Sequence, residues 1–559
     1  MKKLLLLILT VAFLLRAVGL NSYPPGFTPD EASFGYDAYS ILETGRDQWG
    51  KSFPLTLQSF GDYKSPLYSY VAIPFVAVFG LEKYSVRLAN AVVGTLAVYL
   101  TYLLAYELFN NRLIFKTKVD PEIGAIIASF LLAISPWHVM MSRGAFEANL
   151  TTLLMPAALY FFVKGVERPK YFIYCAFAIG LNVFSYHSAK FVTPILFLTL
   201  FVLFRKELTK KFGIHHKISL FILLVFAGLF LLSMRSGSAT RVFDVSIFKT
   251  ALVEASSQRS AAINQGANSY LSRVIYNKYI VGVRHFFANY TTYFSPQFYF
   301  SQGPAETTYG MIPGRGVLYW FELPLLLAGF VYFLKNYANK FSWLVVIWYL
   351  VGPIPAALSL GPGYAANRAE VVLPSIQIIC AVGVVFLSHL NFRFRKQFVY
   401  ASGSAVVAIF FFYFLFDYFV SSPQKMSEGM LYGNYEAAKY LSFGYSQDQI
   451  VMSRKLSEPH IYVAFVNRWD PANYQKVTKA WNYKQIGLGW VDQMPEYSLG
   501  NYTFKNINYQ EYADKRVILV GKPDEFPQSL SLSKVFSYPG GKQSVVVVDT
   551  SSQIYAWKN

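Results

Sequence analysis

Two adjacent carboxylates follow the first apolar run of the chain, in the stretch PPGFTPDEASFGYDAYSILETG at residues 24–45. These are Asp30 and Glu31. Thr28 precedes them, and a threonine followed by early acids is typical of a helix N-terminus. One carboxylate could instead act as a general base that takes a proton from an acceptor hydroxyl, while the other orients it or binds a cation. Both interpretations stay open on the residues alone.

A lysine comes next, in the stretch DYKSPLY. Lys64 could reach the lipid boundary from the foot of a helix, with Pro66 at the point where that helix begins. It could equally bind a phosphate, because an ammonium group near a leaving phosphate stabilises the charge that develops there.

A third polar group lies between two apolar runs, in SPWHVMMSRGAFEANL at residues 135–150. Arg143 and Glu147 are four residues apart, so on one helix they would share a face and could pair. In the alternative interpretation, Glu147 faces the same pocket as Asp30 and Arg143 lies near a phosphate.

Further cations lie where a lipid headgroup or an anionic substrate could meet them. His187 and Lys190 occupy the short turn FSYHSAKFVTP, and Arg368 lies in GPGYAANRAE. A lone histidine is more often structural than catalytic, and the arginine could be a solvated helix cap. The long segment 235–316 is strongly basic, with Arg235, Arg241, Lys249, Arg259, Arg273, Lys278, Arg284 and Arg315 against Asp244, Glu254 and Glu306. Its aromatic end, 286–316, could lie at the membrane interface, which we favour, or line a sugar site.

The elements that position these residues belong to a membrane protein. The chain has 559 residues, of which 54% are hydrophobic and 14% charged, and a mean hydropathy of +0.33. Soluble domains carry roughly a quarter charged residues. The net charge of +19 falls mostly in short links between apolar runs, which is the positive-inside pattern and argues against nucleic-acid binding.

Apolar runs near the length of a bilayer-spanning helix recur along the first 420 residues. We find about eleven, which predicts an all-α polytopic bundle of about eleven transmembrane helices. They lie near 4–20, 86–108, 123–141, 149–163, 171–186, 190–204, 218–234, 317–334, 341–360, 369–390 and 398–419. The basic links place the amino terminus in the cytoplasm and everything after about 420 outside. The first run could also be a cleaved signal peptide.

The composition changes near residue 421. Short alternating runs such as RVILVG and QSVVVVDT indicate strands, and GNYEAAKYL indicates a helix. We therefore expect residues 421–559 to form a small extracytoplasmic α/β domain on the outer face.

The sequence does not require a metal or cofactor. Cys175 and Cys380 both lie inside apolar runs, which makes a disulfide framework or a cysteine-based metal site unlikely. No HExxH motif occurs, and His138, His187 and His285 are far apart along the chain. A divalent cation stays open as an alternative.

The motifs, in their order, resemble those of the membrane glycosyltransferases of the GT-C class. The closest resemblance is to the protein O-mannosyltransferase superfamily and its bacterial relatives, the lipid A aminoarabinose transferase and the RgtA/B/C/D-like sugar transferases. It is carried by PDEASFGYDAYSILETG, by DYKSPLYSYVAIPFVAVFGLEKYSVRLANAVVGTLAVYLTYLLAYELF and by AISPWHVMMSRGAFEANL. Beyond about residue 200 it is only a general pattern.

The resemblance implies a polyprenyl-phosphate-linked sugar donor and inversion at the anomeric carbon. It makes residues 1–420 the transferase domain, with the catalytic acids in a first outer loop, 21–85, and a long outer loop at 235–316. By position it implies Asp30 as the base with Glu31 beside it, and Lys64 as a donor-phosphate contact, although relatives have Lys-Pro-Pro where this chain has Lys-Ser-Pro. Glu147 matches the relatives' second acidic residue, where many of them have Asp, and we expect it to be catalytic together with Asp30 and Glu31. Together with Lys64, the donor-phosphate contacts that we expect are Arg143, His187, Lys190, Arg315 and Arg368.

Two other functions stay open on the sequence. The chain could be a transporter or flippase of a lipid-linked saccharide, although such proteins usually show internal repeats and charges near the bilayer midplane. It could also be an O-antigen ligase-like enzyme that depends on the basic outer loop. In the transferase interpretation the partners are the lipid-linked donor, the bilayer of the cell membrane, and an acceptor that is a protein, a glycan or a lipid.

Overall fold

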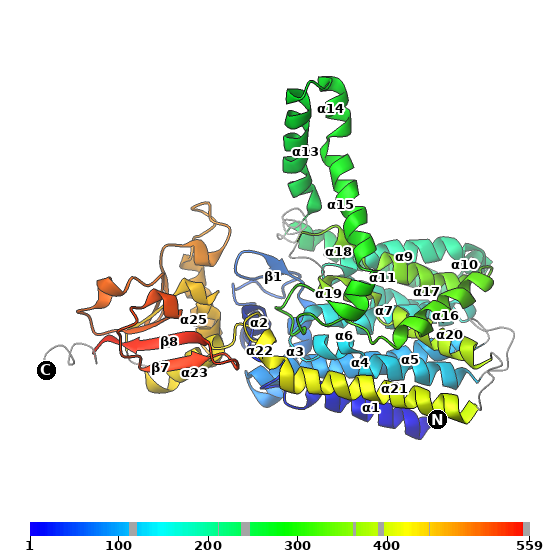
Figure 1. The fold of residues 1–559 in the computed structure, drawn as a ribbon, viewed down its shortest axis with the longest axis horizontal. Coiled ribbons are helices and arrows are strands. Elements are labelled where there is room, and N and C mark those ends of the chain that lie inside the picture. Colours follow the sequence, from blue (N-terminus) through cyan, green and yellow to red (C-terminus); the bar gives the residue numbers. More distant parts are fainter. Residues whose placement is uncertain are drawn as a thin grey trace.

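A computed structural model describes residues 1–110, 120–210, 212–235, 246–360, 365–389, 396–445 and 448–551. A helical bundle carries the sheet-containing C-terminal domain at one end, and a helical arm leaves its side (Figure 1). Arg241, Asp244 and most of the basic links at 110–118 and 391–397 lie outside the described residues.

The bundle consists of α1 (Lys2–Ala17), α4 (Lys83–Phe109), α5 (Pro121–Ile134), α6 (Pro136–Met141), η1 (Glu147–Asn149), α7 (Leu150–Glu167), α8 (Tyr171–Val183), α9 (Ala189–Leu203), α10 (Arg205–Lys210), α11 (Ile214–Ser233), η3 (Gln297–Ser301), α16 (Glu322–Lys335), α17 (Lys340–Val351), α18 (Ile354–Ala357), α19 (Ala366–Ala369), η4 (Glu370–Val372), α20 (Ser375–Ser388), α21 (Lys396–Phe416) and η5 (Asp417–Ser421).

Every predicted apolar run contains a helix, and the chain is a multi-pass membrane protein. Within the described residues, five helices are long and apolar enough to cross a bilayer, or six if the bent pair Ala366–Val372 and Ser375–Ser388 counts as one span. Several of the other apolar helices are shorter than a full span, so the predicted number of about eleven stays a prediction.

Burial separates the centre of the bundle from its edge. The most apolar windows of α4 and of the η1–α7 span are 61% buried, whereas those of α11 and the span Ala401–Ser421 are only 11% buried. Because the hydrophobic residues of α11 and α21 have little protein to contact, these helices expose their side chains to lipid.

The predicted first outer loop is mostly ordered structure. It contains α2 (Pro29–Thr44), α3 (Leu67–Phe79) and a short antiparallel hairpin of β1 (Leu57–Gln58) and β2 (Tyr63–Lys64). Thr28 caps α2, as its sequence predicts, and Gly45 ends that helix in the left-handed conformation at φ 67°. The apolar residues of α2 and α3 are buried against the C-terminal domain as well as against the helical bundle.

The C-terminal domain contains a six-stranded mixed sheet in the order β4-β5-β3-β6-β8-β7. Strand β3 is parallel to β5 and β6, and the other neighbours are antiparallel. The strands and helices of the domain are α22 (Pro423–Met426), α23 (Asn434–Gly444), β3 (Ile450–Met452), η6 (Arg454–Leu456), α24 (Pro459–Val466), α25 (Pro471–Ala480), η7 (Val491–Gln493), β4 (Tyr497–Leu499), β5 (Tyr502–Phe504), η8 (Tyr509–Tyr512), β6 (Ile518–Gly521), η9 (Pro523–Glu525), β7 (Lys534–Ser537) and β8 (Gln543–Asp549).

This domain shares one hydrophobic core with α2, α3 and the start of α4. Two tyrosine hydroxyls join the parts: Tyr36 donates to the Trp469 carbonyl at 2.9 Å, and Tyr462 donates to the Phe27 carbonyl at 2.8 Å. The C-terminal domain is therefore seated directly on the helix that begins with the acidic pair.

The long basic segment forms a helical arm in its first part. The arm consists of α13 (Ile247–Asn264), α14 (Ser269–Ile275) and α15 (Lys278–Thr292). The aromatic stretch that follows does not lie at the lipid interface as a whole, because Phe298, Tyr299 and Phe300 are buried in the bundle. The preference for an interfacial segment was wrong for these residues.

Candidate functional site

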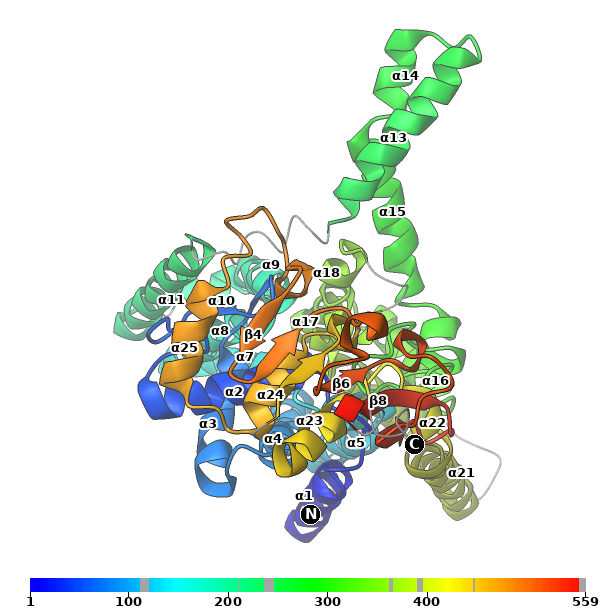
Figure 2. The ribbon, with the colours of Figure 1, turned by 90° about the vertical axis from the view of Figure 1, so that its left-hand side faces the viewer.

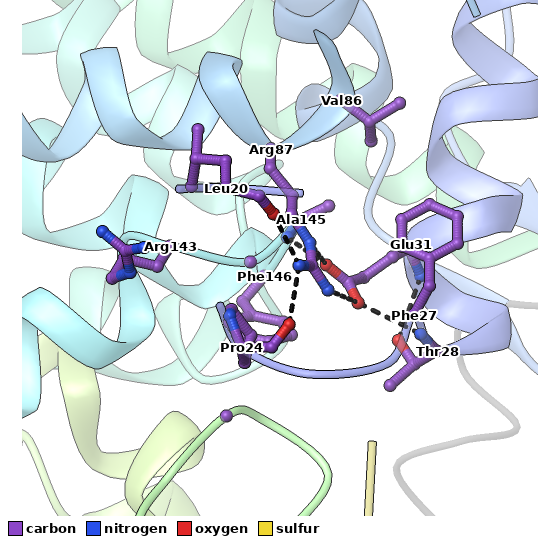
Figure 3. A network of polar contacts seen from close by, with 12 residues as sticks. Leu20, Pro24, Phe27, Thr28, Glu31, Val86, Arg87, Arg143, Ala145 and Phe146 are labelled. Carbon is purple, nitrogen blue, oxygen red and sulfur yellow. Dashed lines mark hydrogen bonds and ion pairs between the residues drawn. The ribbon is translucent and has the colours of Figure 1, made fainter. Parts of the chain in front are cut away.

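Glu31 lies in a fully buried ion pair with Arg87 of α4 (Figure 3). The guanidinium contacts both carboxylate oxygens, with Nε–Oε1 at 2.8 Å and Nη2–Oε2 at 3.0 Å. The Ala145 and Thr28 amides donate to the same two oxygens, each at 3.0 Å. The remaining Arg87 donors bind the carbonyls of Leu20, Pro24 and Gly26. This network fixes the first turn of α2 against α4.

Asp30 has different surroundings from its neighbour. Its side chain is 43% exposed and forms an ion pair with Lys64. The Lys64 side chain is only 3% exposed, and its ammonium lies 5.1 Å and 5.2 Å from the ring centres of Phe34 and Phe60. The β1–β2 hairpin holds Lys64, and His187 steadies that hairpin through a 3.0 Å contact between its Nε2 and the Tyr63 carbonyl.

A cavity of about 260 Å³ opens beside Asp30. Its other carboxylates come from three separate parts of the chain: Glu147 at the start of η1, Glu306 after the arm, and Glu458 of the C-terminal domain. Aromatic and small side chains complete the wall, among them Phe60, Phe146, Tyr309 and Trp490. A cluster of carboxylates stabilises positive charge that develops on a bound group, which suits a reaction through an oxocarbenium-like state.

Glu458 has an unusual local structure. Ser457 and Glu458 have φ values of 55° and 47°, a left-handed conformation that non-glycine residues rarely adopt. The Asp492 carboxylate accepts a 2.6 Å hydrogen bond from the Glu458 amide, and the Ser457 hydroxyl donates to Glu458 Oε2 at 2.5 Å. Burial, together with the charges of Asp492 and Asp30, raises the pKa of the Glu458 carboxyl to about 7. Backbone strain of this kind often marks functional positions.

Two of the predicted phosphate contacts lie elsewhere. Arg143 follows α6, which ends at Met141, and it donates to the carbonyls of Leu15, Val18 and Tyr23. It does not share a helix with Glu147, so the first of the two alternatives, a pair on one helix, is wrong. Arg315 is paired with Asp417 at 2.5 Å. Neither arginine lines the cavity beside Asp30.

A second cavity, of about 250 Å³, gathers other predicted residues. His187 and Arg368 line it together with apolar residues such as Phe191 and Phe248. Arg368 donates to the Ser359 hydroxyl at 2.8 Å, and Lys190 Nζ lies 3.4 Å from His187 Nδ1. Because His187 contacts the residue next to Lys64, this cavity is connected to the hairpin of the first site.

Sequence reasoning missed three residues of the site. Arg87 offered a signal, because a charge inside an apolar run needs a buried partner. Glu306 and Glu458 offered none, since only the folding of distant segments brings them to Asp30. In the described part of the chain, no group of three or more His, Cys, Asp or Glu side chains is arranged to hold a metal ion.

Comparison with known proteins agrees with this architecture. Residues 63–230 match the family described as dolichyl-phosphate-mannose-protein mannosyltransferase, a segment that includes Lys64 and Glu147 but not Asp30. No curated protein sequence matches the chain. The crystal structure of ArnT from Cupriavidus metallidurans bound to undecaprenyl phosphate aligns over 97% of both chains at 13% identity, with a TM-score of 0.52. The apo structure of ArnT aligns over 98% of both chains at 14% identity, with a TM-score of 0.50.

At such low identity the likeness to ArnT shows a shared fold and no more. The archaeal oligosaccharyltransferase AglB from Archaeoglobus fulgidus aligns over 83% of this chain and 63% of that chain at 15% identity, but its TM-score of 0.49 is too low to support an argument. The chain thus shares its fold with ArnT, and residues 63–230 are similar to the dolichyl-phosphate-mannose-protein mannosyltransferase family.

Replacing Arg87 should destabilise the folded protein. Arg87→Met leaves the Glu31 carboxylate buried without its cation, so we expect the free energy of unfolding to fall by about 3–5 kcal/mol. Arg468→Met is the matched control, because Arg468 pairs with Glu82 at 2.8 Å but on the surface, and should cost less than about 1 kcal/mol. Denaturation in mixed micelles measures both, and equal losses would contradict a structural role for the buried pair.

Glu458→Gln should change stability only at high pH. The raised pKa means that the folded protein keeps a proton that the unfolded chain releases, so stability falls as the pH rises from about 4.5 to about 7. The neutral variant avoids this loss. We expect it to melt at a higher temperature than the unmodified protein at pH 8.5, and at the same temperature at pH 4.5. Glu511→Gln, on the domain surface, should show no such difference, and a pH-independent effect of Glu458→Gln would contradict the account.

Proposed function

We propose that this chain transfers a sugar from a polyprenyl-phosphate-linked donor to a hydroxyl acceptor at the outer face of the cell membrane, with inversion at the anomeric carbon. The observation that supports the proposal is that Asp30 and Glu147 line one cavity together with residues of the C-terminal domain, and that Lys64 contacts Asp30 there. A lipid-linked donor keeps its tail in the bilayer and its phosphate at the surface, so its chemistry requires such a place.

In this proposal Asp30 is the general base. The acceptor oxygen attacks the anomeric carbon while its proton passes to the Asp30 carboxylate, and the bond from that carbon to the phosphate oxygen breaks. The leaving group takes the bonding electrons as a polyprenyl phosphate, which is stable enough to leave without a general acid. The Asp30 carboxylate lines the cavity, is half exposed and pairs with Lys64, whereas both oxygens of Glu31 are buried and bound by Arg87 and backbone amides. Glu31 therefore positions Asp30.

Lys64 stabilises the leaving phosphate. Inversion requires the base and the leaving group to lie on opposite sides of the anomeric carbon. We therefore infer that a bound donor separates Lys64 from Asp30 and places the phosphate against the ammonium. His187, Lys190 and Arg368 gather at the second cavity, whose apolar wall suits the first part of a lipid tail. No step of this proposal uses a metal ion.

The acceptor enters from the side of the C-terminal domain. Ser457, Glu458 and Trp490 of that domain line the cavity, so a bound acceptor would contact them. The volume of about 260 Å³ is below that of pockets for drug-sized ligands, roughly 300–1,000 Å³, which favours transfer of a single sugar. The acceptor is a protein, a glycan or another lipid.

Asp30→Asn should abolish transfer while donor binding remains. Removing a general base typically costs about 10²–10⁴-fold in rate. The assay uses a panel of radiolabelled polyprenyl-phosphate sugars in membranes, which also identifies the sugar. Glu43→Gln is the control, because Glu43 is an exposed carboxylate on the same helix, and it should transfer normally.

The other outcomes discriminate among functions. Equal transfer by the unmodified protein and Asp30→Asn would remove Asp30 as the base and favour a ligase-like mechanism. Movement of lipid-linked sugar across the bilayer without transfer would support a transporter, against the family match.

A further inference from the structure

The helical arm of residues 247–292 leaves the bundle sideways. Figure 1 shows it running across the direction of α1, α4 and α21, and Figure 2, seen from the end of the bundle, shows it reaching out beyond the other helices. Two hydrogen bonds fix its root: Tyr290 donates to the Leu350 carbonyl at 2.7 Å, and Asn289 to the Ala357 carbonyl at 3.2 Å. Because α17 and α18 end there, the arm leaves the bundle near the end that carries the C-terminal domain (Figure 1).

The arm is packed with its small residues inside. The contact between α13 and α15 is made by Ala251, Ala255 and Val281, and Gly282 lies so close to Phe248 that an added Cβ would come within 2.5 Å of its ring. Glu254 of α13 also contacts Arg284 and His285 of α15, each at 2.5 Å. A hairpin stable in water would place its large apolar side chains in this contact.

The large apolar side chains are on the outside instead. Their exposed fractions range from 48% at Val283 to 75% at Tyr270, and the set consists of Leu252, Val253, Tyr270, Leu271, Val274, Ile275, Tyr279, Ile280, Val283 and Phe287. On α14 they recur at 270, 271, 274 and 275, and on α15 at 279, 280, 283 and 287, so each helix has one apolar face. An apolar surface of this extent requires an apolar environment.

The charge of the arm identifies that environment. Residues 247–292 contain five Lys or Arg and one acid, Glu254, a net charge of +4 with histidine neutral. Arg273 and Lys278 flank the apolar residues of α14 and the start of α15. Cations beside an apolar helix face, with tyrosines among them, match the boundary between acyl chains and anionic headgroups.

We propose that the arm lies in the interfacial layer of the outer leaflet, with its apolar faces among the acyl chains and its lysines and arginines at anionic lipid headgroups. This role is independent of the transfer chemistry. It ties the bundle to the membrane plane beside the second cavity, because Phe248 of α13 lines that cavity.

Lipid-borne quenching tests the position of the arm. A fluorophore on Leu271→Cys, in the full chain in nanodiscs that contain anionic lipid, should lose most of its fluorescence to brominated acyl chains and emit at a blue-shifted wavelength. Phe443→Cys is the control, an exposed apolar helix position, 81% exposed, in the C-terminal domain, and should be unaffected. Cys175 and Cys380 are buried, so the label goes to the introduced cysteine.

Further measurements distinguish anionic lipid from water or a second copy of the chain as the environment of the apolar faces of the arm. Adding anionic lipid should increase quenching at position 271, and Arg273→Gln with Lys278→Gln should remove that increase. Emission as in water at position 271 would overturn the proposal. So would energy transfer between labelled copies without lipid quenching, because a second copy of the chain would then cover the apolar faces.

Discussion

The buried ion pair between Glu31 and Arg87 is the interaction on which the site depends. A paired charge inside a membrane protein is costly unless every hydrogen-bonding group is satisfied, and here the backbone of 20–28 and of Ala145 completes the network. The pair joins the link after α1, the start of α2, the start of α4 and the loop before η1. It therefore fixes Asp30 and Glu147 relative to each other, although more than a hundred residues separate them in the chain.

The two neighbouring acids have different roles because their electrostatic surroundings differ. Glu31 is held by a buried cation and serves the structure, whereas Asp30 is half exposed and contacts a lysine that sits between two aromatic rings. The C-terminal domain closes the cavity with a carboxyl whose pKa is raised by burial to about 7. A site with several carboxylates and one adjacent ammonium favours positive charge on a sugar ring and negative charge on its leaving phosphate.

The sequence predicted the features that depend on local patterns. Apolar runs became helices, Thr28 became a helix cap, and RVILVG and QSVVVVDT became β6 and β8. Asp30, Lys64 and Glu147 do gather at one place. The arm was missed because its apolar residues alternate with cations and polar residues, so no run reached the length of a span. Glu458 and Glu306 were missed because their place in the site arises only from contacts between distant segments, and Arg143 was misplaced because the short α6 ends before it.

The measurement that tests this account most directly is a structure of the full chain in a lipid nanodisc with a polyprenyl phosphate bound. We predict that a phosphate oxygen lies within hydrogen-bonding distance of Lys64 Nζ, that the ion pair with Asp30 is broken, and that the lipid tail leaves past the second cavity. A phosphate bound away from Lys64, with the pair to Asp30 intact, would contradict the proposed site of transfer.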